Sequence, residues 1–221
     1  MSEQNRNTLT STLSRTSPVL ICIFGFANCI LNPSYESFYL FIVLLALSPA
    51  NWIIKHMFVK PFYNFLNVKS LPILGIGERP TGATSCGFTL DNIIDTSYGM
   101  PSGHSQMIWT FGTYLICKAI NNWINKQNGN DDKDNDKDND KDNNKDNDNM
   151  ITQITVFGYM CIILVCAIIL LIMIFVSYSR VYIEGCHTIQ QVFAGGILGV
   201  ITGFIIYYFE NDALKVLSKI I

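Results

Sequence analysis

Residues 161–176 read CIILVCAIILLIMIFV, sixteen residues with no charge among them. They form the centre of a charge-free run over 150–176, which is longer than the roughly 20 apolar residues that a helix needs to cross a bilayer. Lipid offers no hydrogen bonds to the backbone, so a spanning segment of this kind must satisfy its own N–H and C=O groups as a helix. The stretch therefore predicts an all-α membrane protein.

Other apolar runs predict further membrane helices. The runs 35–57, 104–123 and 188–209 carry at most a few charges, and these stand near their ends. The shorter run 18–31 is interpreted as a retained, marginal span, with a re-entrant piece or a signal-like segment as the alternatives. Together the runs predict a polytopic helix bundle of about five spans. Within the last run Gly195, Gly199 and Gly203 recur every four residues, which favours close packing against a neighbouring helix.

The composition divides the chain into a charge-poor part and one highly charged tract. Residues 126–149 hold 9 Asp and 5 Lys, which is 14 of the 32 charged residues. We expect this tract to be a disordered loop, because it offers no apolar side chains that would offset the entropy cost of ordering. The domain prediction is a polar segment 1–17, a membrane domain 18–209 interrupted by that loop, and a tail 210–221. No basic patch for nucleic acid is visible.

The seven cysteines show no CxxC spacing and no disulfide framework. Most stand in apolar runs, where a thiol behaves as a small hydrophobic group. Cys86 and Cys186 stand in polar segments. A disulfide between them is the less favoured alternative, and it requires that the two segments meet in an oxidising compartment.

Counting the spans places two polar segments, 55–101 and 177–187, on one membrane face. Basic residues and histidines gather there: Lys55, His56, Lys60, Lys69, Arg79, His104, Arg180 and His187. Ionisable groups near the ends of membrane helices indicate function, and cations with histidines suggest a bound anion. The alternative is that the lysines only hold lipid head groups.

The tetrapeptide Pro101-Ser102-Gly103-His104 is typical of the start of a helix. Ser102 is a good N-cap, and the first N–H groups of a helix form an anion site. Gly103 allows close approach of a phosphate, and His104 stands where it can pass a proton to a leaving oxygen. An ordinary capped span with a surface histidine is the alternative. Arg180 suits a phosphoryl group, and His187 suits a nucleophile or base.

These residues together resemble the type 2 phosphatidic acid phosphatase superfamily, which includes membrane lipid phosphatases and soluble haloperoxidase relatives. The motifs that carry the resemblance are Glu78-Arg79-Pro80, Pro101-Ser102-Gly103-His104, and Ser179-Arg180 followed by His187. In detail, the residues Tyr98 to Gln106, and His187-Thr188 with Gln191-Val192, look like dolichyldiphosphatase. Asn51-Trp52-Ile53-Ile54-Lys55 is similar both to that branch and to glucose-6-phosphatase.

Two spacings depart from the family pattern. The family places a lysine seven residues before Arg79, where this chain has Pro72, so Lys55 is the expected motif lysine and Lys69 its competitor. Six residues separate Arg180 from His187, where five are usual, and we expect a local bulge near Glu184-Gly185 to absorb the extra one. Gln191 replaces the aspartate that many members have there, and it can still orient the imidazole of His187.

The resemblance implies a metal-independent membrane phosphatase with His187 as nucleophile, His104 as acid and base, and a phosphohistidine intermediate. It implies that Lys55, Arg79, Ser102, Gly103 and Arg180 bind the phosphate and that no cofactor is needed. The expected partner is a membrane lipid, with a polyprenyl or dolichyl diphosphate as first substrate, in an endomembrane such as the endoplasmic reticulum. The alternatives are a sugar-phosphate phosphatase and an inactive protein that binds anionic lipid heads. The sequence gives no indication of oligomeric state.

Overall fold

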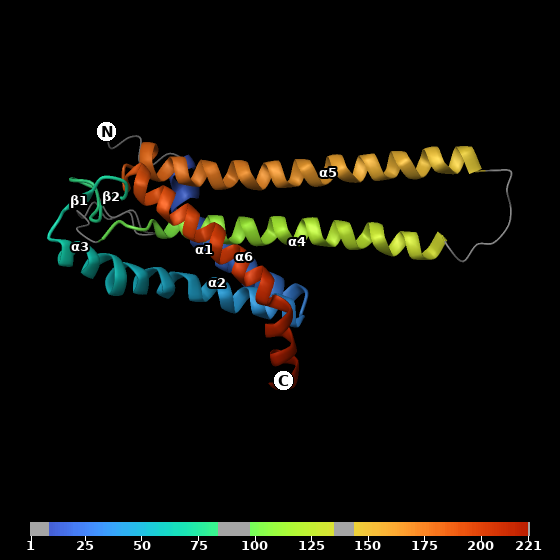
Figure 1. Ribbon diagram of the computed structural model, residues 1–221, viewed down its shortest axis with the longest axis horizontal. Coiled ribbons are helices and arrows are strands. Elements are labelled where there is room, and N and C mark those ends of the chain that lie inside the picture. Colours follow the sequence, from blue (N-terminus) through green and yellow to red (C-terminus); the bar gives the residue numbers. More distant parts are fainter. Residues whose placement is uncertain (1–8, 84–97, 135–143, 221) are drawn as a thin grey trace. The chain divides into compact units, whose positions relative to one another are not determined.

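A computed structural model describes residues 9–83, 98–134 and 144–220 of the chain (Figure 1). The path begins with helices α1 (Leu9–Leu31) and α2 (Tyr35–Ile53), the π-helical turn η2 (Ile54–Val59) and the short helix α3 (Lys60–Leu66). A small antiparallel hairpin follows, in which β1 (Ser70–Leu71) pairs with β2 (Gly75–Ile76). The second half consists of α4 (Gly103–Asp134), α5 (Asn144–Tyr178), the π-helical turn η3 (Ser179–Ile183) and α6 (Ile189–Ile220).

Four helical segments of the described residues are long and apolar enough to cross a membrane: Leu9–Leu31, Tyr35–Leu66, Val156–Ile183 and Ile189–Lys219. The fold is therefore the expected all-α membrane bundle. The expected span 104–123 forms the first part of α4 but does not reach the same apolarity. Its buried side chains include Ser105, Gln106 and Thr110, because this helix turns a polar face toward the interior.

Helix α1 begins earlier than the apolar run that was expected to form it. It starts at Leu9, inside the segment 1–17 that we expected to be separate, and it contains Pro18 in its interior. Proline has no N–H to bond to the carbonyl four residues before it, here that of Ser14. The hydroxyl of Ser17 donates to this Ser14 carbonyl at 2.8 Å instead. Local satisfaction of that carbonyl explains how the helix continues through the proline.

Both ends of the acidic tract are helical, where a disordered loop was predicted. Helix α4 continues to Asp134 and α5 begins at Asn144, so both ends of 126–149 are helical, and only 135–143 lies outside the described residues. Extending an existing helix avoids the cost of nucleation, which explains how polar residues continue α4. The residues predicted as a separate tail, 210–221, instead continue α6, which runs to Ile220.

The described residues form two compact units, one within Met1–Tyr114 and Met173–Ile221 and the other within Leu115–Ile172. In the second unit the rings of Trp123 and Tyr159 pack with centroids 4.1 Å apart. In the first unit α1 packs on α2, and α2 on α6.

The first unit also holds the contact between α6 and α4. A Cβ atom on Gly195 would lie 2.5 Å from the carbonyl oxygen of Ser102, and one on Gly203 would lie 2.7 Å from that of Thr110. The predicted glycine face is confirmed. It allows α6 to lie directly against the backbone of α4 at the position of the candidate site.

Candidate active site

His187 is buried just before α6, and Gln191 holds its ring. Its Nδ1 lies 3.1 Å from Oε1 of Gln191, which also accepts the N–H of Thr188 at 3.2 Å. The amide nitrogen of Gln191 donates to the carbonyls of Ile76 and Glu78 at 2.9 and 2.6 Å, which fixes the orientation of the amide. An amide oxygen can only accept, so Nδ1 of His187 carries the proton and Nε2 keeps a lone pair. Nε2 is therefore the ring atom with a lone pair to offer to a ligand.

Ser102 stands at the start of α4 beside the same glutamine. Its backbone N–H donates to the carbonyl of Gln191 at 3.0 Å, so this N–H does not face an anion. Its hydroxyl is buried and makes no hydrogen bond within the described part of the chain, so Ser102 does not cap α4 with its side chain as predicted. The hydroxyl of Ser102, rather than its N–H, is therefore without a hydrogen-bond partner among the described residues. Gly103 follows as the first residue of the helix.

Arg180 lies in the π-helical turn η3 and is 1% exposed. A π turn contains more residues per turn than an α turn, and such turns are frequent at functional sites. The backbone N–H groups of Cys186 and His187 both donate to the carbonyl of Arg180, at 3.1 and 3.3 Å. Gly185, which lies between Arg180 and Cys186, has φ +65°, a value that glycine adopts without strain. The extra residue is thus accommodated by η3 and by the expected bend at Gly185.

Three cations of the described residues act on His187. Burial lowers the pKa of His187 well below its ordinary value, and the nearby charges of Arg180, Arg79 and Lys55 lower it further. The ring is therefore neutral at pH 7, as a nucleophile must be. The same three cations act electrostatically on His104. The two histidines and three cations singled out from the sequence therefore lie within electrostatic reach of one another.

The two candidate lysines are placed differently. Lys55 lies in η2, is half-buried, and is one of the cations that act on His187. Lys69 is exposed on the segment that follows α3. The residues between Lys55 and Arg79 form α3 and the hairpin, and the hydroxyl of Tyr63 in α3 donates to the carbonyl of Gly75 at 3.0 Å. This insertion folds back on itself, which explains how a wide spacing still brings Lys55 near the site.

The sequence model of the PAP2 superfamily matches residues 75–215, well over half of the chain. The chain belongs to the PAP2 superfamily. Membership implies phosphatase activity on phosphate esters. Comparison with curated proteins and with solved structures finds no match, so the likeness in motif detail to dolichyldiphosphatase has no support from a relative.

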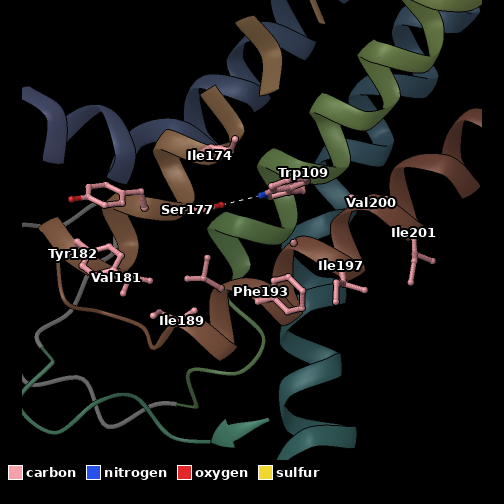
Figure 2. A pocket seen from close by; sticks show the side chains of 13 residues that line it. Trp109, Ile174, Ser177, Val181, Tyr182, Ile189, Phe193, Ile197, Val200 and Ile201 are labelled. Carbon is pink, nitrogen blue, oxygen red and sulfur yellow. Dashed lines mark hydrogen bonds between the residues drawn. The ribbon is translucent and has the colours of Figure 1, made fainter. Parts of the chain in front are cut away.

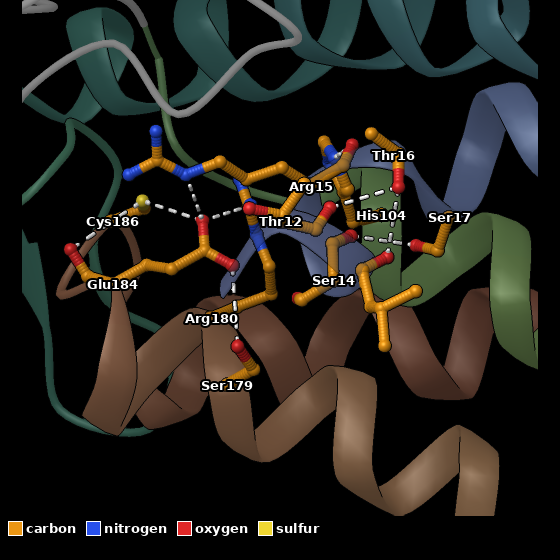
Figure 3. Close-up of polar contacts among 11 residues, drawn as sticks. Thr12, Ser14, Arg15, Thr16, Ser17, His104, Ser179, Arg180, Glu184 and Cys186 are labelled. Atoms are coloured by element: carbon orange, nitrogen blue, oxygen red, sulfur yellow. Dashed lines mark hydrogen bonds and ion pairs between the residues drawn. The ribbon is translucent and has the colours of Figure 1, made fainter. Parts of the chain in front are cut away.

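The match to the PAP2 superfamily begins after α1, yet α1 contributes directly to the site. Ser11, Ser14 and Arg15 are buried on one face of this helix, and Nε2 of His104 lies 3.1 Å from the carbonyl oxygen of Arg15. Figure 3 shows this face of α1 beside Arg180 and Glu184. We did not predict these residues, because α1 carries no family motif. The spacing of Ser11, Ser14 and Arg15, which places them on one helical face, was the available indication.

Beside the candidate site the chain has an apolar groove of about 440 Å³ (Figure 2). Its wall includes Val181 and Tyr182, which directly follow Arg180, and Val192, which follows Gln191. At its inner end the indole N–H of Trp109 donates to the hydroxyl of Ser177 at 2.9 Å. The other lining residues come from α5 and α6 and are Ile174, Tyr178, Ile189, Phe193, Gly196, Ile197, Val200 and Ile201.

Cys186, next to His187, is disulfide-bonded. A disulfide at Cys186 was the less favoured alternative in the sequence analysis. Its expected partner, Cys86, lies outside the described residues. Cys22, Cys29, Cys117, Cys161 and Cys166 are free thiols, as their apolar surroundings predicted.

Proposed function

We propose that this protein is a membrane phosphatase that hydrolyses a lipid phosphate or diphosphate through a phosphohistidine, without a metal ion. One observation carries the proposal: His187 is held with a free Nε2 lone pair among Arg180, Arg79 and Lys55. Guanidinium and ammonium groups can themselves balance the charge that develops on phosphoryl oxygens. The independence from metal stays a prediction that a chelator tests.

The proposed reaction is two displacements at phosphorus. Nε2 of His187 attacks, a P–N bond forms, the P–O bond to the leaving group breaks, and His104 gives that oxygen a proton. Water then attacks the phosphohistidine, His104 takes a proton from the water, and the P–N bond breaks to release phosphate and restore His187. Lys55, Arg79, Arg180, the Ser102 hydroxyl and Gly103 hold the phosphoryl oxygens, and Gln191 keeps the ring oriented.

The apolar groove supports a lipid as the substrate. It adjoins Arg180 and Gln191 through their chain neighbours, and its wall is almost wholly hydrocarbon and aromatic. A phosphate held at the site would leave an attached hydrocarbon tail beside this groove. A polyprenyl diphosphate is the first substrate to test, on the strength of the motif likeness to dolichyldiphosphatase.

The disulfide at Cys186 supports a location for the site. Disulfides persist in oxidising compartments, so we propose that the site faces a lumen or the cell exterior and that the acidic tract faces the cytosol. An endomembrane such as the endoplasmic reticulum is the proposed setting, with the bilayer lipid as the partner.

The test of function is phosphate release from a prenyl diphosphate by the purified chain with excess chelator. We expect turnover by the wild type and a loss of about a thousandfold or more in His187→Ala, because the nucleophile is gone. His56→Ala is the matched control and should keep full activity, since among the described residues His56 contacts Trp52, by ring stacking and with Nδ1 2.9 Å from its carbonyl oxygen. Equal turnover by His187→Ala would refute the mechanism.

Two substrate panels separate the alternatives. Faster release from a water-soluble sugar phosphate than from any lipid would favour the sugar-phosphate phosphatase. No release from either panel, with retained binding to vesicles of anionic lipid, would favour the inactive lipid-binding protein.

A further inference from the structure

The carboxylate of Glu184 lies between two arginines at the bottom of the site (Figure 3). It is 2.5 Å from Nη1 of Arg180 and 3.4 Å from Nε of Arg15, and the Ser179 hydroxyl donates to its other oxygen at 3.2 Å. All three charged side chains are at most 7% exposed. A carboxylate with two guanidinium groups and a hydroxyl around it has the surroundings that a phosphoryl group needs.

Arg15 enters this arrangement from α1, outside the segment that matches the PAP2 superfamily. The contact between the Arg15 carbonyl and His104 fixes this turn of α1 against the start of α4. Nε of Arg15 is buried and makes no hydrogen bond to a described residue, although it forms the ion pair with Glu184. Arg15 is therefore held at the site, and the N–H of its Nε lies near Glu184 without donating a hydrogen bond to it.

Two hydroxyls are also available to an anion bound beside Arg15 and Arg180. The side-chain oxygens of Ser14 and Ser102 are fully buried and make no hydrogen bond within the described part of the chain. Ser14 precedes Arg15 on α1, and Ser102 precedes the helix that carries His104. Buried hydroxyls without partners are uncommon in proteins, and here both belong to the turns that surround the site.

We propose that Arg15 is a further phosphate-binding residue and that Glu184 holds the place of a phosphoryl group until an anion displaces it. The ligand chemistry rests on the proposed function. Glu184 then acts as an internal competitor for Arg15 and Arg180, and the substrate must bring more negative charge than one carboxylate. A diphosphate meets this demand better than a monoester, because it offers more oxygens and more charge to the same cations.

The local backbone gives Glu184 room to leave. Gly185 follows it with φ +65°, and a Cβ atom on this glycine would meet no atom of the described residues within 4 Å. The segment between η3 and His187 therefore bends at an uncrowded residue, so the carboxylate can swing out while the main-chain bonds to the Arg180 carbonyl stay in place.

The experiment measures equilibrium binding of inorganic phosphate to the purified full chain, without turnover. We expect Glu184→Gln to bind phosphate about tenfold or more tightly, because the competing charge is removed. Arg15→Gln should bind it about tenfold or more weakly, because a charge-assisted contact is lost. Lys60→Gln, at an exposed cation near the site, is the matched control and should bind as the wild type does.

The double variant Arg15→Gln/Glu184→Gln guards against misfolding, because it removes both buried charges together. Its phosphate affinity compared with that of Glu184→Gln gives the contribution of Arg15. An unchanged or weakened affinity in Glu184→Gln, or equal affinities in Glu184→Gln and the double variant, would overturn the inference. If Glu184 only formed a structural ion pair with the arginines, the phosphate affinity of Glu184→Gln would not exceed that of the wild type.

The same assay separates this inference from the proposed function. Wild-type turnover combined with phosphate binding that ignores Arg15 and Glu184 would remove the inference alone. Arg15-dependent phosphate binding without turnover of any phosphate ester would remove the proposed function and leave the inference standing.

Discussion

His187 owes its proposed reactivity to neighbours that act on different atoms of its ring. Gln191 accepts the proton of Nδ1, which leaves the lone pair on Nε2, while burial and three cations lower the pKa of the ring. The hydrogen bond to the neutral Gln191 amide raises the pKa of the ring, but less than a carboxylate there would, and burial and the cations outweigh it. The result is an imidazole that is neutral at pH 7 and loses its lone pair to a proton only at a lower pH than an ordinary histidine, whose pKa is about 6.5.

At this scale the pH profile distinguishes the two candidate lysines. Lys55→Gln removes one of the positive charges that lower the pKa of His187, so that pKa rises and the acid limb of kcat/KM moves to higher pH. The same variant should lose about tenfold in kcat/KM at pH 7, since a phosphate contact is lost. Lys69→Gln should leave both unchanged, because Lys69 is exposed. A shift in Lys69→Gln and none in Lys55→Gln would reverse our assignment.

The residues that sequence reasoning identified and those it missed differ in a physical way. His104, Arg180 and His187 stand in short motifs whose spacing reflects local geometry, so they can be found by inspection. Arg15 and Glu184 meet only through the packing of α1 against η3, which no local pattern records. The role of Ser102 was mispredicted for the same reason. Its N–H, which we expected to face an anion, donates to the Gln191 carbonyl of α6, and its hydroxyl does not cap α4.

At the scale of elements, apolar length predicted the helices well and their ends poorly. The apolar run 18–31 gave no reason to start α1 at Leu9, because the first turns bury polar side chains against the site. The turn η3 was likewise not predicted, since the expected bulge lay just after it, near Glu184-Gly185. Polar burial and π-helical turns depend on tertiary contacts, which hydrophobicity along the chain does not report.

The contact between α6 and α4 makes a test at this scale. A Cβ atom on Gly199 would lie 2.6 Å from the carbonyl oxygen of Gln106 and 3.0 Å from the N–H nitrogen of Thr110, so Gly199→Ala forces two backbones apart. We expect it to destabilise the protein by about 1–3 kcal/mol, seen as a lower midpoint of thermal unfolding in detergent. In Gly196→Ala the added atom meets Trp109 at an ordinary 3.5 Å, so this control should unfold as the wild type does. Equal midpoints for both variants would contradict the packing.

At the scale of the molecule, the charged tract and the candidate site lie in different parts of the chain. The tract that dominates the charge totals lies at the ends of α4 and α5. The candidate site lies within the other compact unit, where few charged residues are buried and each has a specific contact. Composition averaged over the whole chain therefore describes the tract, and the site is visible only in individual residues.

The most direct test of the account is to trap the phosphoryl group on the enzyme. The purified chain is mixed with a prenyl diphosphate labelled in its terminal phosphate, quenched in alkali within the first turnover, digested and analysed by mass spectrometry. We predict an alkali-stable, acid-labile phosphate on His187, absent in His187→Ala and present in His56→Ala. Turnover with phosphate on another residue, or with none on the protein at any time, would contradict the proposed nucleophile.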